Sequence, residues 1–580
     1  MFLPTTTEEM KAQGLDSLDI ILVTGDAYID SPFMGVALIG KFLVDSGFTV
    51  GVIAQPDTAS CVDIERLGEP KLFWGVTGGA IDSMVANRTA TGKKRRRDDY
   101  TPGGRNERRP DRAVINYANL IRKSFKSTSP IVLGGIEASL RRVAHYDFWS
   151  DCVRRSILFD AKADYLLYGM AERAAGELAE TLKAGGDPTM IRGLSFVSKE
   201  RPEGALELPS YEEAAKDKVE FEKMFKMFYD NNDPLTAKTL AQAHGTRYLV
   251  QNPPALPLTT AELDRIHDLD FERDAHPETI KDGEVRALKT IRFSISTHRG
   301  CYGECGFCAI GVHQGRLVTS RSKTSILKEA KVLTRHALFK GRIDDVGGPT
   351  ANMYGFECEK KEREGSCKDI NCVMPKICKQ LPVDHGPQIE LLRAIRLVKG
   401  VKKAVVASGL RYDMILADKR NGISYLRELV RHHVSGQMKI APEHSEEHVL
   451  RLMQKPGTSS LIKFRELFSK FTKEAGLDQY LTYYLIAAHP GSTLDDMKKL
   501  RRFCADELKS LPEQVQQFTP TPSTYSTLIY WTGRDPFTDA PCFVERSVKG
   551  REAQKEAVIV KRGPRGPRYG KIKRKTGQKS

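Results

Sequence analysis

The first part of the chain alternates short apolar runs with stretches of helical apolar spacing. Residues 18–26 (LDIILVTGD) are a buried-strand run that ends in Gly and Asp, and residues 34–47 (MGVALIGKFLVDSG) repeat apolar positions at the helical period. Further strands are predicted within residues 48–56, 129–139 and 163–182. This order predicts a doubly wound, mostly parallel α/β sheet over residues 1–190, with ligands at the carboxyl ends of its strands.

The apolar pattern weakens over residues 191–289, which predicts a region that connects two domains. A second alternating series follows. Its strand candidates are residues 290–300, 341–348, 402–409, 436–443, 480–491 and 513–522. Amphipathic stretches lie between them, so residues 290–535 are predicted to form a partial (β/α)6 barrel with its chemistry at the strand C-termini.

Charge is distributed unevenly along the chain. The formal net charge is +16, but the last twenty residues alone hold nine Lys or Arg and no acid. Within a C-terminal extension over residues 536–580, this composition predicts a disordered basic tail, for which nucleic acid is a candidate partner. A second charged run, residues 93–112, predicts a solvated loop, with a phosphate-binding loop as the less favoured alternative.

How the eleven cysteines are interpreted depends on the cellular compartment, because the compartment decides whether thiols stay reduced. The N-terminus has no basic region leading into an apolar run, and no apolar stretch approaches the ~20 residues needed to span a bilayer. We therefore expect a cytoplasmic protein that does not enter the membrane. Its thiols would stay reduced, and clustered cysteines then indicate metal binding or catalysis.

Three cysteines lie within the stretch HRGCYGECGFCAIGVHQGR. Cys301, Cys305 and Cys308 have the spacing C-x3-C-x2-C, and Phe307 stands directly before the third. Structural zinc usually takes four protein ligands, and the next cysteine along the chain is Cys358. Three thiolates would instead fill three corners of an iron-sulfur cubane and leave one iron open to a small molecule.

This first cysteine set resembles the signature of the radical S-adenosylmethionine superfamily. The segments DVGGPTANMYG, SGLRYDM, APEHSE, QQFTPTPSTYST and GGIEASLRRVAHYDFWSD narrow the resemblance to the YgiQ family, over about residues 18 to 560. It implies a [4Fe-4S] cluster on the three cysteines, with S-adenosylmethionine on the open iron. It also implies reductive cleavage to a 5′-deoxyadenosyl radical, and a low-potential electron donor such as flavodoxin or ferredoxin. The resemblance implies no particular substrate.

The resemblance further implies six positions around S-adenosylmethionine: Phe307, Gly347, Gly348, Ser408, Arg411 and Glu443. The glycine pair follows the second barrel strand, where the absence of side chains lets the backbone approach a ligand. The acidic residue usual after the pair is replaced by Pro349. Ser408 and Arg411 end the third strand, where a hydroxyl and a guanidinium would hold ribose and carboxylate.

A second cysteine set lies in a predicted insertion at residues 355–380. It consists of Cys358, Cys367, Cys372 and Cys378, whose spacing matches no common zinc pair. An auxiliary iron-sulfur cluster, a structural zinc and unliganded cysteines all remain open, since spacing alone does not separate metals.

The N-terminal sheet resembles the cobalamin-binding domain that precedes many radical S-adenosylmethionine barrels. The loop after its first strand usually reads D-x-H-x-x-G, where the His ligates cobalt; here DSPFMG keeps Asp30 and Gly35 but has Pro32 at the His position. We therefore favour a relic of the fold or a different small ligand over cobalamin. Two alternative functions stay open: methylthiolation or methylation of RNA or protein, and a non-catalytic iron-sulfur or zinc module that binds nucleic acid.

Overall fold

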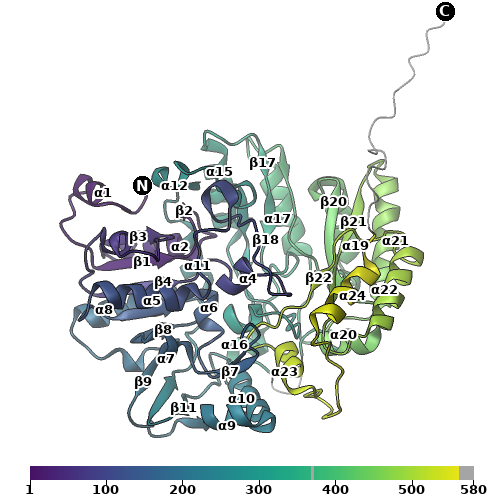
Figure 1. Ribbon diagram of the computed structural model, residues 1–580. Helices are drawn as coiled ribbons and strands as arrows, with labels where there is room; N and C mark the ends of the chain where they lie inside the picture. The colour runs from purple at the N-terminus through teal and green to yellow at the C-terminus, as the bar shows by residue number, and fades with distance from the viewer. Residues whose placement is uncertain (368–370, 561–580) are drawn as a thin grey trace, which may run out of the picture.

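The structure is a computed structural model that describes residues 1–367 and 371–560. The predicted basic tail lies outside the described residues, and so does a short part of the cysteine-rich insertion. Figure 1 shows the N-terminal sheet, coloured purple to blue, beside a second group of strands and helices coloured teal to yellow.

A nine-stranded sheet forms the N-terminal part, in the order β10-β11-β12-β9-β8-β5-β4-β1-β3. Its parallel half consists of β1 (Ile20–Thr24), β3 (Val50–Ala54), β4 (Phe73–Thr77), β5 (Ile131–Gly134) and β8 (Tyr165–Leu167). The chain passes from β1 to β3 on one side and then to β4 on the other. The strand order therefore reverses beside β1, and ligands of doubly wound sheets bind at such a reversal. The predicted α/β class with a parallel sheet is confirmed.

Side chains on this sheet alternate between two faces, as the strand period requires. Ile21, Val23, Trp74 and Val76 pack with α5 (Ala113–Ser124). Their neighbours on the same strands face the other way, toward α2 (Gly35–Asp45) and α8 (Glu172–Lys183), as Leu22 and Phe73 do. Gly75, in register with Leu22, faces α2 and α8 as well but has no side chain.

The sheet continues beyond residue 190, which differs from our expectation of a connecting region over 191–289. Four strands extend it: β9 (Leu194–Ser198), β10 (Leu206–Leu208), β11 (Leu240–His244) and β12 (Arg247–Gln251). The pairs β8–β9, β9–β12 and β11–β12 are antiparallel. Polar residues occupy several positions of these strands, which is why their apolar pattern is weak.

The second part contains parallel strands in chain order. β14 (Ser294–Ser296) pairs with β18 (Asp345–Gly347), and β17 (Arg342–Ile343) pairs with β19 (Lys403–Ala404). A single bridge from Leu410 to Ile440 leads to β20 (Gln437–Glu443), which pairs with β21 (Tyr480–Ala487) and through it with β22 (Gln516–Gln517). The helices between these strands include α15 (Lys323–Arg335), α17 (Gly386–Arg396) and α21 (Thr458–Glu474), which enclose a second apolar core.

The charged run at residues 93–112 is only partly solvated, which corrects the loop prediction. Its basic residues from Lys93 to Arg97 are exposed. Arg109, however, is fully buried and pairs with Asp26 at 2.6 Å and Asp98 at 3.0 Å. The segment thus closes over the carboxyl end of β1.

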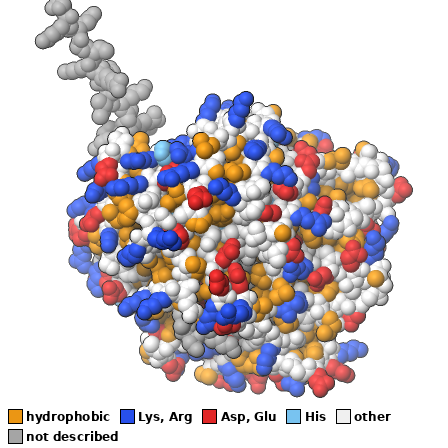
Figure 2. All heavy atoms as spheres, turned by 180° about the vertical axis from the view of Figure 1, so that it is seen from behind, with side chains coloured by type: hydrophobic (Ala, Val, Ile, Leu, Met, Phe, Trp, Pro, Cys, Tyr) orange, Lys and Arg blue, Asp and Glu red, His pale blue; other side chains and the backbone are white. Residues whose placement is uncertain are grey.

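The surface seen from behind mixes basic and acidic side chains across the face (Figure 2). No helix among the described residues is long and apolar enough to cross a membrane.

Candidate cluster site and adjoining cavity

The first cysteine set lies in a loop between β15 (His298–Arg299) and α14 (Ile310–His313). Gly300 has φ +80°, and a Cβ there would lie 1.8 Å from the Leu317 carbonyl oxygen, so the turn requires glycine. The Gly306 N–H donates to the Met453 carbonyl at 2.9 Å, and the Gly306 carbonyl accepts from Ser526 N–H at 2.8 Å. The loop is therefore fixed to residues from much later in the chain.

The three thiols lie close together beside cationic groups. The Gly303 N–H donates to Cys301 Sγ at 3.2 Å, and Arg411 Nη1 lies 4.0 Å from Cys305 Sγ. Burial raises the pKa of Cys308 to about 12, with further contributions from Cys305 and Cys301, while Lys455 opposes the rise. Burial also raises the pKa of Cys301. Each thiol of the set thus interacts electrostatically with another.

These residues fit a cluster better than a single metal ion. No three His, Cys, Asp or Glu side chains within residues 1–367 and 371–560 converge on one ion position. A four-iron cubane is larger than an ion, so its sulfur ligands stand further apart. The donors here are all sulfur, which suits iron-sulfur chemistry, and three of them leave one corner open.

The predicted glycine pair ends β18 next to the cysteine loop. A Cβ on Gly348 would lie 2.6 Å from the His298 ring, and a Cβ on Gly347 would lie 3.4 Å from Ser408 Cβ. Ser408 Oγ donates a short hydrogen bond to Asp345 Oδ2. The structure therefore brings Gly347, Gly348 and Ser408 together at the ends of neighbouring strands.

Arg411 lies beside the cysteine loop, and Glu443 ends β20. Arg411 forms two hydrogen bonds with Asp413, at 2.9 and 2.6 Å. Glu443, buried and with φ +69°, faces Lys455 Nζ at 3.7 Å, and its burial raises its pKa. Since Lys455 also acts on Cys308, Glu443 is linked to the cluster loop through this lysine.

Phe307 packs away from the thiols, edge-on to His489 at 6.4 Å between ring centroids. His489 in turn bonds Ser526 Oγ at 2.7 Å. Sequence reasoning missed Lys455 and also Thr350, whose Oγ1 lies 3.3 Å from Cys301 Sγ. Thr350 stands two residues after the glycine pair, so its position in the motif was a usable signal; Lys455 lies too far along the chain to give one.

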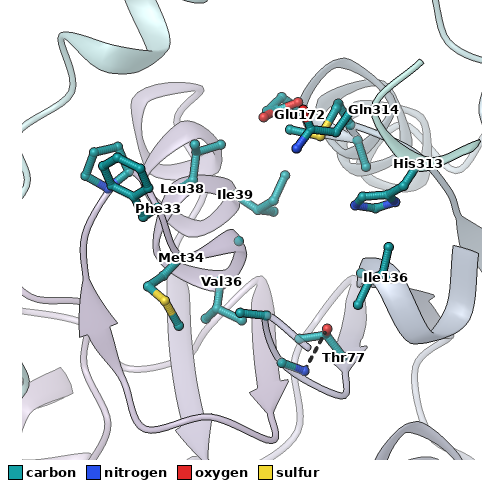
Figure 3. Close-up of a pocket in the computed structure, with 18 of the residues that line it drawn as sticks. Phe33, Met34, Val36, Leu38, Ile39, Thr77, Ile136, Glu172, His313 and Gln314 are labelled. Carbon is teal, nitrogen blue, oxygen red and sulfur yellow. Dashed lines mark hydrogen bonds between the residues drawn. The ribbon is translucent and has the colours of Figure 1, made fainter. Parts of the chain in front are cut away.

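A cavity of about 560 Å³ lies between the N-terminal sheet and the second part of the structure. It reaches from Gly75 in the middle of β4 to Gly347, Gly348 and Ser408 of the second part. Figure 3 shows an apolar wall with Val36 and Ile39, and a polar end with His313. Its volume is typical of a ligand pocket.

The second cysteine set packs around Tyr302, the residue that follows Cys301 in the chain. Cys358 and Cys372 are buried in an apolar cluster that includes Met353 and Phe356, and Cys378 packs against it. The Cys358 N–H donates to the Tyr302 hydroxyl at 3.3 Å. Burial raises the pKa of Cys372 to about 11; Lys361, which hydrogen-bonds the thiol, opposes the rise, while Glu304 and Cys358 add to it. Cys367 is half-buried.

Comparison with known proteins places the chain in a family. A family model described as "Radical SAM N-terminal" matches residues 2–294. The chain is 53% identical to UPF0313 protein FN0734 of Fusobacterium nucleatum, over 97% of this chain and 99% of that one. It is 49% identical to a UPF0313 protein of Thermotoga petrophila, over 98% and 100%. The chain therefore belongs to the UPF0313 family, within the radical SAM superfamily.

One solved structure resembles the whole fold. It is the radical S-adenosylmethionine methyltransferase TsrM of Kitasatospora setae with cobalamin and a [4Fe-4S] cluster bound. The TM-score is 0.51 at 13% identity, covering 94% of this chain and 91% of that chain. At this identity the likeness concerns the fold.

Proposed function

We propose that the protein is a radical S-adenosylmethionine enzyme whose [4Fe-4S] cluster is held by Cys301, Cys305 and Cys308. The observation that carries the proposal is the position of these thiols, at the mouth of parallel strands and next to a cavity that reaches the glycine pair. Family membership supports it independently. When bound, the cluster supplies the electron that cleaves S-adenosylmethionine to methionine and a 5′-deoxyadenosyl radical.

The chain's own residues would bind and orient the cofactor. Gly347 and Gly348 would let the backbone approach the methionyl part, and Arg411 would offer a guanidinium beside Cys305. Ser408, already bonded to Asp345, is positioned for the ribose. Lys455 and Arg411 offset the negative charge of three thiolates in a buried place. A flavodoxin or ferredoxin is the proposed reductant, in a cytoplasmic setting.

A second candidate, methyl transfer, is favoured by one specific observation. The fold matches that of a methyltransferase solved with cobalamin, and the cavity lies where the strand order of the sheet reverses. A corrinoid bound there would supply methyl-transfer chemistry. The acceptor would be a substrate that enters the cavity, with RNA or protein as candidate classes.

The second cysteine set is proposed to be unliganded and to fill the apolar cluster behind Tyr302. Among the other thiols of this set only Cys358 acts on Cys372, and it is the smallest of the causes, whereas Cys308 of the first set is influenced by both of its partner thiols. Unliganded, buried cysteines behave as small apolar residues.

The test is the formation of 5′-deoxyadenosine by anaerobically reconstituted protein with dithionite and S-adenosylmethionine. Wild type is expected to form it, and Cys305→Ala is expected to form none. Cys542→Ala, outside both sets, is the matched control and should retain wild-type formation. Nucleoside formation by Cys305→Ala at the wild-type rate would overturn the assignment.

A further inference from the structure

The segment that follows the glycine pair holds the backbone of Arg411 in place. Asn352 is fully buried and bonds both polar groups of that backbone: its Oδ1 accepts the Arg411 N–H at 2.8 Å, and its Nδ2 donates to the Arg411 carbonyl at 3.0 Å. One residue earlier, the Ala351 N–H donates to the Gly409 carbonyl at 2.9 Å. Residues 351–352 are therefore tied directly to residues 409–411.

The Arg411 backbone also fixes which way the Asn352 amide points. A backbone N–H can only donate and a carbonyl can only accept, so Oδ1 must face the first and Nδ2 the second. The amide nitrogen has a second hydrogen, and His385 Nε2 lies 3.2 Å from it. His385 Nε2 therefore accepts this hydrogen bond, and the proton of the neutral ring is on Nδ1.

Asp418 stabilises this tautomer of His385. Its Oδ2 accepts from His385 Nδ1 at 2.8 Å and from the His385 backbone N–H at 2.8 Å. Its Oδ1 accepts from the backbone N–H groups of Arg420 and Asn421. Burial lowers the pKa of His385, while Asp418 opposes the fall. The ring is therefore neutral near pH 7, as its bond from the amide requires.

Asp418, His385, Asn352 and Arg411 thus form one buried chain of hydrogen bonds. Each of the four residues is at most 5% exposed. Asn352 stands before the cysteine-rich insertion and His385 stands after it, so the chain joins the two ends of the insertion. A buried network whose donors and acceptors are paired holds a single arrangement rigidly.

The Arg411 side chain lies at the cluster end of this chain. Its guanidinium bonds Asp413 at 2.9 and 2.6 Å, and Nη1 lies 4.0 Å from Cys305 Sγ. Asp413 is only two residues further along the same backbone. The guanidinium and its carboxylate partner are therefore both carried by the backbone that Asn352 holds.

We propose that Asn352 is a positioning residue, which holds Arg411 where its guanidinium binds S-adenosylmethionine beside Cys305, and that His385 and Asp418 hold the Asn352 amide. The inference rests on the proposed function, in which Arg411 helps to bind S-adenosylmethionine. It assigns Asn352 no contact with the cofactor. The effect of Asn352 on cleavage therefore passes through Arg411.

The experiment is a double-mutant cycle on full-length, anaerobically reconstituted protein, measured as kcat/KM for S-adenosylmethionine cleavage under dithionite. Asn352→Ala should lower kcat/KM about 10-fold, mainly through a higher KM, because misplacing a binding group is costly. In the Arg411→Met background the same substitution should lower kcat/KM by less than about 2-fold, since the group that it positions is already gone.

The matched control is Asn87→Ala. Asn87 is also buried and donates to a backbone carbonyl, that of Arg109, at 3.0 Å, but it lies in the N-terminal part of the structure. Asn87→Ala should keep the wild-type kcat/KM. Iron content and thermal unfolding show whether each variant is folded. If Asn352→Ala does not hold its iron, Asn352→Asp replaces it in the cycle with the same expectation, because it keeps an acceptor for the Arg411 N–H and loses both donors.

Two results would overturn the inference. One is a wild-type kcat/KM in the Asn352 variant. The other is an equal loss with and without the Arg411 guanidinium, because Asn352 would then act on the fold and not through Arg411. These outcomes require an active wild type, so they count against the positioning role alone. A wild type that forms no 5′-deoxyadenosine instead contradicts the proposed function, and the inference fails with it.

Discussion

The two cysteine sets lie close in the fold but differ in what surrounds them. Around the first set are a backbone N–H, the hydroxyl of Thr350 and the cations Arg411 and Lys455. Around the second, Lys361 hydrogen-bonds Cys372, and the other neighbours are Tyr302, methionine and further apolar side chains. Donors and cations stabilise thiolates, while an apolar surrounding stabilises neutral thiols. The surroundings therefore differ in degree: the first set has two cations, a hydroxyl and a backbone N–H beside it, and the second has one cation, Lys361.

The largest expected effect comes from removing each set as a whole. Replacing Cys301, Cys305 and Cys308 together with alanine should remove essentially all iron, because we propose that the second set holds no cluster. The matched triple replacement of Cys358, Cys372 and Cys378 should leave about four irons per chain. Iron and sulfide analysis of the two variant proteins tests this prediction. If the variant of the second set loses its iron and the variant of the first set keeps it, the second set is the one that holds the cluster.

Next in size is the effect of the cation beside the first set. Arg411→Met should keep the iron but lower S-adenosylmethionine cleavage about 10- to 100-fold, since charge-assisted hydrogen bonds contribute about 1.5–3 kcal/mol. The change leaves Asp413 buried and unpaired, so Arg411→Met with Asp413→Asn is the control for folding. If a well-folded Arg411→Met protein cleaves S-adenosylmethionine at the wild-type rate, the Arg411 guanidinium does not contribute to cleavage.

A smaller effect is expected from the second set alone. Cys372→Ala should leave iron content and cleavage unchanged and lower the free energy of unfolding by about 1 kcal/mol, as for other small deletions in a core. Chemical denaturation measures it. If Cys372→Ala instead halves the iron, the second set holds a cluster and our interpretation of it is wrong.

The smallest effect is expected at Thr350. A thiolate ligand at Cys301 leaves the hydroxyl as the only donor of their 3.3 Å contact. Hydrogen bonds to sulfur raise the reduction potential of a cluster, so Thr350→Val should shift it to a more negative value, and Thr350→Ser should restore it. A redox titration followed by paramagnetic resonance reports the shift; identical potentials in all three proteins would contradict this role.

Local patterns predicted the parts of the fold that depend on short stretches of sequence. The runs at residues 18–26 and 34–47 became β1 and α2, and the cysteine spacing marked the first set. Strand β4 was missed because Gly75 interrupts a run of only five residues.

Other features depend on residues far apart in the chain. Glu172 meets Arg299 only because the start of α8 packs near the cysteine loop, and Arg109 is buried only because it reaches Asp26. A charged run and a single glutamate look the same in sequence whether they are solvated or buried. Their roles therefore became visible only in the assembled fold.

The central claim is that one cluster, on the first cysteine set, cleaves S-adenosylmethionine. The most direct measurement is iron, sulfide and zinc per chain of anaerobically reconstituted wild type, together with 5′-deoxyadenosine formed under reduction. The account predicts about four irons, no zinc and nucleoside formation. Protein that binds no iron, or that binds it and forms no 5′-deoxyadenosine, would contradict it.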